Sequence, residues 1–245
     1  MSKMNTKKYL ESLEDDFVDD IDEGTEYFEG LEEEDLEEDK SKDHKDAEES
    51  DEEKEEEEEE EHHEAADEPS EIRLLNLCQN GGKLKKVRKL IEDLNVDVNI
   101  RDQENHHRTP LIIACENGRR GIVKLLLNDE RVVVNLTDNL GQTPLFHACM
   151  NRKVEIVKLL LEHERVNINI ENNRGQTPFI HACLYNYADI VQLLLESGRE
   201  ININERYQNR SLFSYAINLK AVRIFTLLKK FEKGKLPSKI SSFNI

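Results

Sequence analysis

The sequence predicts an all-α solenoid of about five stacked helix-turn-helix repeats with hairpin fingers, over residues 71–235, preceded by a disordered acidic segment. One observation behind this prediction is that a Thr-Pro dipeptide and, six residues later, a Cys recur at intervals of 34 residues. The recurring residues are Thr109, Thr143 and Thr177, with Cys115, Cys149 and Cys183. The second observation is that charge is unevenly distributed: residues 1–70 contain 34 acidic and 7 basic residues, whereas residues 71–245 contain 19 acidic and 27 basic residues.

The acidic segment, residues 1–70, has a net charge of −27 and cannot bury enough apolar surface to offset chain entropy, so it should be disordered. Within it, Leu10, Leu13, Phe17 and Ile21 are spaced as on one face of a helix. Two interpretations stay open. The segment either folds on a partner or is a solubilising tail with incidental apolar residues.

Two serines, Ser12 and Ser50, precede acidic residues and resemble phosphorylation sites of the casein kinase 2 type. The amino terminus runs into acidic residues rather than an apolar stretch, and no segment is long and apolar enough to cross a bilayer. We therefore expect an intracellular protein, in the cytoplasm or the nucleus, whose cysteines stay reduced.

Each repeat is expected to contain two short helices. Thr is a good N-cap and Pro suits the first helical position, so a helix should begin after each Thr-Pro. In the first such unit, Leu111, Ala114 and Cys115 form one apolar stripe, and Gly118 can end the helix. The second helix contains residues 122–127, which are too apolar to face water alone, so the units must stack.

Two degenerate units flank the three that match closely. The first lacks Thr-Pro, and the last begins at Ser211, again 34 residues after the preceding Thr. Atypical ends are expected because terminal repeats cap a stack. The expected repeats are about 72–102, 103–138, 139–172, 173–206 and 207–235, followed by a C-terminal tail at 236–245.

These residues resemble the ankyrin-repeat family, whose unit of about 33 residues carries Thr-Pro-Leu-His-x-Ala. The likeness extends from Asp102 to Asn204 and includes the turn glycines and the Ile-Val-x-Leu-Leu-Leu segment of the second helix. It implies a non-enzymatic scaffold or adaptor that binds another protein, of unknown identity, through a concave surface of finger tips and inner helices.

The chain departs from the family motif at its His. Phe146 and Ile180 stand where the family has His, and His147 and His181 lie one position later. The turn that follows Asp102 is two residues longer than its counterparts, so that finger should protrude.

The His-Ala-Cys sequences that end at Cys149 and Cys183 suggest a metal or thiol site. Residues i and i+2 lie about 200° apart on a helix, so such a pair cannot share one ion. We expect buried Cys and partly exposed His at these positions. Motifs for nucleotide binding, hydrolysis or metalloprotease chemistry do not occur in the sequence, so we expect no catalytic residue, no metal, no cofactor and no enzyme activity.

The resemblance places candidate partner-binding residues in two sets. The finger-tip set is Asn139, Leu140, Gln142, Asn173, Arg174 and Gln176. The inner-helix set is Met150, Asn151, Leu184 and Tyr185. Exposed large side chains usually dominate binding energy, so the Met, Leu and Tyr are the expected anchors. The alternative is that Leu184 and Tyr185 pack on the neighbouring repeat.

A second function of another class rests on charge alone. The acidic segment would act as a chaperone or decoy for basic proteins such as histones. Nucleic-acid binding by the repeats is disfavoured, because their basic residues are scattered along the sequence and the acidic segment competes for them. We expect a monomer that does not bind membranes.

Overall fold

The repeat domain is a row of five helix pairs. The computed structural model describes residues 68–234, so the acidic segment with Ser12 and Ser50 lies outside the described residues. The inner helices are α2 (Ser70–Asn80), α4 (Pro110–Glu116), α6 (Pro144–Met150), α8 (Pro178–Leu184) and α10 (Leu212–Asn218). The outer helices are α3 (Leu84–Glu92), α5 (Arg120–Asn128), α7 (Val154–Glu162), α9 (Ala188–Glu196) and α11 (Val222–Glu232).

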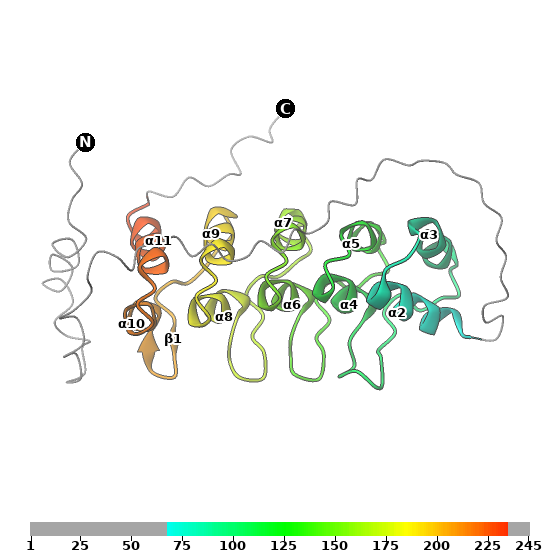
Figure 1. The fold of residues 1–245 in the computed structure, drawn as a ribbon, viewed down its shortest axis with the longest axis horizontal. Coiled ribbons are helices and arrows are strands. Elements are labelled where there is room, and N and C mark those ends of the chain that lie inside the picture. Colours follow the sequence, from blue (N-terminus) through cyan, green and yellow to red (C-terminus); the bar gives the residue numbers. More distant parts are fainter. Residues whose placement is uncertain (1–67, 235–245) are drawn as a thin grey trace, which may run out of the picture. The chain divides into compact units, whose positions relative to one another are not determined.

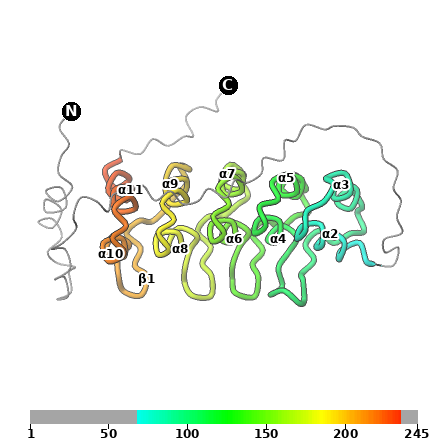
Figure 2. Tube along the Cα trace, viewed as in Figure 1, coloured from blue at the N-terminus to red at the C-terminus, as the bar shows by residue number. Residues whose placement is uncertain are grey.

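The helices form two layers. Each inner helix packs on the inner helices before and after it, and the outer helices form a second layer against them (Figure 1). Between successive pairs the chain runs into long loops, the fingers, which project from the side of the inner layer (Figure 2). The last finger carries a short antiparallel hairpin of β1 (Arg206–Tyr207) and β2 (Arg210–Ser211). The prediction of an all-α repeat fold is confirmed.

The Thr-Pro dipeptides begin the inner helices as predicted. Thr109, Thr143 and Thr177 each accept a hydrogen bond from the backbone N–H three residues on, at 3.3, 3.2 and 3.2 Å. Ser211 caps α10 in the same way at 3.2 Å. These caps satisfy N–H groups that have no intrahelical partner, and each contributes about 1 kcal/mol.

The interior between the two layers is apolar and continuous from repeat to repeat. Phe146 of α6 and Leu160 of α7 are almost completely buried. All four cysteines are free and buried, so the burial predicted for Cys149 and Cys183 is confirmed. Burying one such aliphatic or aromatic side chain contributes about 1.5–3 kcal/mol, so the stack is stabilised mainly by this shared core.

The turns that join inner to outer helices use the left-handed backbone region. Gly118 takes this conformation with φ +71°, but Arg152 occupies the equivalent position of the next repeat with φ +53°. A non-glycine residue is disfavoured there by about 1 kcal/mol. The guanidinium carbon of Arg152 lies 5.4 Å from the ring centroid of Tyr187, an attraction that offsets part of this cost.

The first finger differs at its tip from the two that follow it. Its two additional residues form an irregular turn in which His106 and His107 both take left-handed conformations, with φ of +56° and +58°. The turn closes through hydrogen bonds between the backbones of Asp102 and Arg108 and of His107 and Asp102, each 2.9 Å long.

Candidate protein-binding surface

Each central finger is held by one side chain at its base. The Asp138 Oδ1 atom accepts hydrogen bonds from the backbone N–H groups of Leu140 and Gln142, at 2.9 and 2.8 Å. Asn172 Oδ1 makes the same two bonds in the next finger, at 2.9 and 3.0 Å. The residues at the finger tips are therefore displayed in fixed backbone conformations.

Neighbouring fingers are hydrogen-bonded to each other. The Asn139 N–H donates to the carbonyl of His106, and the Asn173 N–H donates to the carbonyl of Leu140, both at 3.0 Å. The side-chain amide of Asn173 also donates to the carbonyl of Asn139 at 2.9 Å. Gly141 permits this approach, because a Cβ atom there would lie 2.8 Å from the backbone nitrogen of Asn173. The first three fingers thus form one connected row.

The third repeat contains a buried charged hydrogen bond. His147 Nε2 donates to Asp138 Oδ2 at 3.0 Å, and both side chains are 0% exposed. The expectation of a partly exposed His is therefore wrong here: the ring turns toward the base of its own finger. Burial alone would raise the pKa of Asp138, but hydrogen bonds from His147 and from the backbone of Gln142 and Leu140 hold that pKa below its usual range.

The fourth repeat replaces this bond with ring stacking. His181 is also buried, so the expectation of partial exposure is wrong for it too. Its ring stacks on Tyr185 with centroids 4.4 Å apart and meets the edge of Phe146 at 4.9 Å. Burial, with a smaller effect of the nearby Arg174 charge, lowers the pKa of His181 to about 4, so the ring is neutral at pH 7. The positive charge of Arg174, on the finger, therefore disfavours protonation of the His181 ring.

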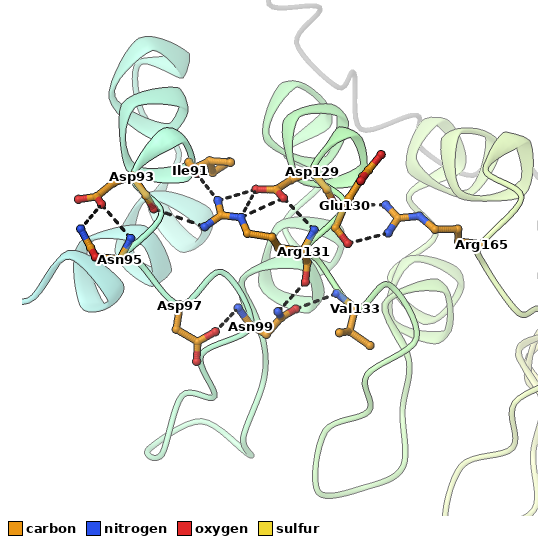
Figure 3. Close-up of polar contacts among 10 residues, drawn as sticks. All are labelled: Ile91, Asp93, Asn95, Asp97, Asn99, Asp129, Glu130, Arg131, Val133 and Arg165. Atoms are coloured by element: carbon orange, nitrogen blue, oxygen red, sulfur yellow. Dashed lines mark hydrogen bonds and ion pairs between the residues drawn. The ribbon is translucent and has the colours of Figure 1, made fainter.

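An arginine that the sequence analysis missed fastens the second repeat to the first. Arg131 donates to the carbonyl oxygens of Ile91 and Asp93, at and just beyond the end of α3 (Figure 3). Its guanidinium also binds Asp129 at 2.7 Å, and this hydrogen bond is the main reason that the pKa of Asp129 is lowered. Helix C-termini leave carbonyl groups without intrahelical partners, and Arg131 supplies donors for them.

Two further arginines link a repeat to the one before it, Arg165 at the end of an outer helix and Arg199 in the loop beyond one. Arg165 donates to the carbonyl of Leu127, at the end of α5, at 2.9 Å, and Arg199 donates to the carbonyl of Val166 at 2.5 Å. Arg131, Arg165 and Arg199 are 34 residues apart, so their recurrence was visible in the sequence. Their role was not, because it depends on where the preceding helix ends in space.

Asparagines make a second set of links between repeats. The Asn99 side chain donates to the carbonyl of Arg131 and accepts from the N–H of Val133, both at 2.8 Å (Figure 3). Asn135 makes the same two bonds to the next repeat, at 2.7 and 2.8 Å. These links keep the loops after the outer helices in register.

The structure separates the predicted finger-tip residues into two groups. Asn139, Leu140, Asn173 and Arg174 are exposed, with Leu140 at 45%. Gln142 is half-buried. Gln176 was expected at the surface, and this is wrong: it is buried, and its side-chain oxygen lies 3.3 Å from the Asn172 amide that donates to it.

The predicted inner-helix residues differ in exposure. Asn151 and Tyr185 are exposed, the latter at 52%, whereas Met150 and Leu184 are half-buried. Tyr185 lies against His181 of its own repeat and 6.1 Å from the Tyr187 ring. The sequence did not indicate Tyr187 or Arg152 as members of this cluster, since neither belongs to the repeated apolar pattern.

Residues 68–234 were also searched for a metal site, a nucleophilic thiol and a membrane-spanning helix. They contain no group of three or more His, Cys, Asp or Glu arranged to hold a metal ion. Burial raises the pKa of the Cys78 thiol to about 12 and raises those of Cys115, Cys149 and Cys183 as well, so these thiols are not nucleophiles at neutral pH. In the same part of the chain, no helix is long and apolar enough to cross a membrane.

A two-layered stack of helix pairs with hydrogen-bonded fingers defines a helical repeat protein. Two family profiles match the chain: Ankyrin repeats (3 copies) over residues 130–207 and Ankyrin repeats (many copies) over residues 90–148. Together the two profiles identify residues 90–207 as ankyrin repeats. No curated protein matches it. Ankyrin repeats are generally protein–protein interaction modules and are typically non-enzymatic.

Proposed function

We propose that this protein is a non-enzymatic scaffold or adaptor that binds a partner protein through its finger tips and the ends of its inner helices. The observation that carries the proposal is Tyr185, which is 52% exposed although its ring is stacked on buried His181 at 4.4 Å. A ring fixed by stacking loses little freedom on binding, so its contact area contributes more of its energy to affinity.

The surroundings of Tyr185 suit an apolar anchor of the partner. The Tyr187 ring lies 6.1 Å away, and the last residues of α8 and α6, Leu184 and Met150, are half-buried. Arg174, on the finger of the same repeat, adds a cation near the cluster. The preferred partner segment therefore combines an apolar or aromatic side chain with an acidic neighbour.

The test uses the full chain as bait in native lysate with crosslinking and quantitative mass spectrometry. Wild type is compared with Tyr185→Ala and with Val133→Ala, a control at a side chain of equal exposure, 52%, in the loop after α5. Tyr185→Ala should lose the partner, with affinity falling about thirtyfold, or about 2 kcal/mol, as for a hot-spot residue. Val133→Ala should retain it. Equal recovery with both variants, each with wild-type circular dichroism, would contradict the proposal.

The alternative function, a chaperone or decoy for basic proteins such as histones, rests on the charge of −27 in residues 1–70. It makes a different prediction in the same experiment. Partners held by the acidic segment should be basic, should be lost as salt is raised, and should be insensitive to Tyr185→Ala.

A further inference from the structure

The outer helices of the first two repeats carry an unusual set of cations. The basic face, as we define it, consists of exposed residues of α3 and α5: Lys85, Lys86, Arg88, Lys89, Arg120 and Lys124. Within the described part of the chain none of the six has an ion pair or a side-chain hydrogen bond. The later outer helices differ: Lys158 of α7 binds Glu155 at 2.5 Å, and Arg223 of α11 binds Asp189 at 2.6 Å.

One difference lies in the first turn of α7 and α9, which carries an acidic residue; α11 lacks one, as α3 and α5 do. Glu155 and Asp189 occupy the same position of the repeat, 34 residues apart, and place a carboxylate at the positive end of α7 and α9. The equivalent residue of α5 is Gly121, and neither α3 nor α5 has an acidic residue in its first turn. Cations near a helix N-terminus and like charges three or four residues apart each destabilise a helix. This part of the stack therefore retains a repulsion that an anion would relieve.

The same two helices also expose an apolar side chain. Leu84, the first residue of α3, is 37% exposed, and a Cβ atom added at Gly121 would lie 2.8 Å from its Cδ1 atom. Leu84 thus covers the place where α3 and α5 approach each other. An exposed apolar side chain on the same two helices as the cations suits a ligand that presents carboxylates beside an apolar residue.

We propose that the basic face binds an acidic polypeptide segment that contains apolar residues. This goes beyond the proposed function, because the face lies on the outer helices rather than on the fingers and inner helix ends. The chain from residue 83 to 124 contains no Phe, Tyr or Trp, so the face offers no ring on which a nucleic acid base can stack.

The test measures binding of two fluorescent probes to the full chain by anisotropy at 50 and 200 mM salt. One probe is a synthetic peptide of about 16 residues built from Glu-Glu-Leu-Glu units, and the other is a uridine oligonucleotide of similar length. The basic-face variant is the triple substitution Lys85→Gln, Lys89→Gln and Lys124→Gln. The matched control removes three cations from later outer helices: Lys158→Gln, Arg223→Gln and Lys230→Gln.

The peptide should bind wild type and the control alike, and the basic-face variant about tenfold more weakly, about 1.4 kcal/mol, since three exposed charge contacts are lost. Binding should weaken at the higher salt. Equal weakening in the two triple variants would show that only net charge matters and would overturn the proposal. Absence of peptide binding, or tighter binding of the oligonucleotide than of the peptide, would overturn it as well.

Discussion

The substitution Asp138→Asn tests whether the buried charged hydrogen bond between Asp138 and His147, at the base of the second finger, stabilises the third repeat. Asn keeps the size of the side chain and the Oδ1 acceptor for the two backbone N–H groups of the finger. It replaces Oδ2 by an amide nitrogen, so His147 must present Nε2 as an acceptor and carry its proton on Nδ1. The Nδ1 atom of His147 is buried and has no hydrogen-bond partner.

The loss of stability expected for Asp138→Asn has two parts. Exchanging a hydrogen bond to a charged group for a neutral one costs about 1 kcal/mol, and a buried N–H without an acceptor costs about 1–3 kcal/mol. Relief of the carboxylate's desolvation offsets part of this, which leaves a loss of about 2 kcal/mol in the free energy of unfolding at pH 7.

The assay is urea denaturation followed by circular dichroism, with Asp102→Asn as the matched control. Asp102 stands at the base of the first finger, but Ile113 occupies the position that His147 has in the third repeat. The control should lose less than about 1 kcal/mol. Because the folded pKa of Asp138 is lowered, its stabilisation is present above the unfolded pKa and disappears as pH falls through the folded value. Equal losses for the two variants at pH 7 would refute the argument.

Three further predictions concern the core and its titration. Leu160→Ala should lower the free energy of unfolding, measured in urea titrations, by about 2–5 kcal/mol. Leu228→Ala should lower it less, because the last described repeat has a neighbouring repeat on one side only. Equal losses would indicate a single globular core. The buried cysteines should react with a thiol reagent only after denaturant is added, and Cys149→Ala should lower stability modestly while partner binding is retained; rapid labelling of the native protein would contradict this. The pKa of His181 falls from 6.5 to about 4 on folding, so the unfolded chain binds more protons between these values and stability should decrease, by on the order of 3 kcal/mol, as pH falls from 6.5 to 4. His181→Leu should remove this slope, and an unchanged slope in calorimetry would assign the titration to other groups.

The sequence predicted those features that depend on local spacing. Thr143 and Pro144 begin α6, and Cys149 is buried, because capping and apolar periodicity act within one repeat. The roles of His147 and Gln176 were predicted wrongly, since both side chains turn to the base of a finger whose path is not encoded by helical periodicity. Arg131 was missed for a similar reason: its partners lie in the preceding repeat, up to 40 residues away.

The sequence did not predict the basic face either. Its basic residues are scattered along the sequence. The first repeat also lacks the Thr-Pro dipeptide from which the register of the other repeats was derived. Only the side-by-side packing of α3 and α5 brings Lys85, Lys89 and Lys124 onto one exposed surface.

The arginine links have a consequence for the order in which the repeats fold during synthesis. Each of Arg131, Arg165 and Arg199 bonds to carbonyl groups that precede it by 33 to 40 residues. A chain leaves the ribosome from its N-terminus, so a repeat emerges before the arginine that binds the carbonyls at or beyond the end of its outer helix. It acquires their donor only when the following repeat has been synthesised. Each newly made repeat therefore completes the one made before it, and folding during synthesis proceeds with a lag of about one repeat.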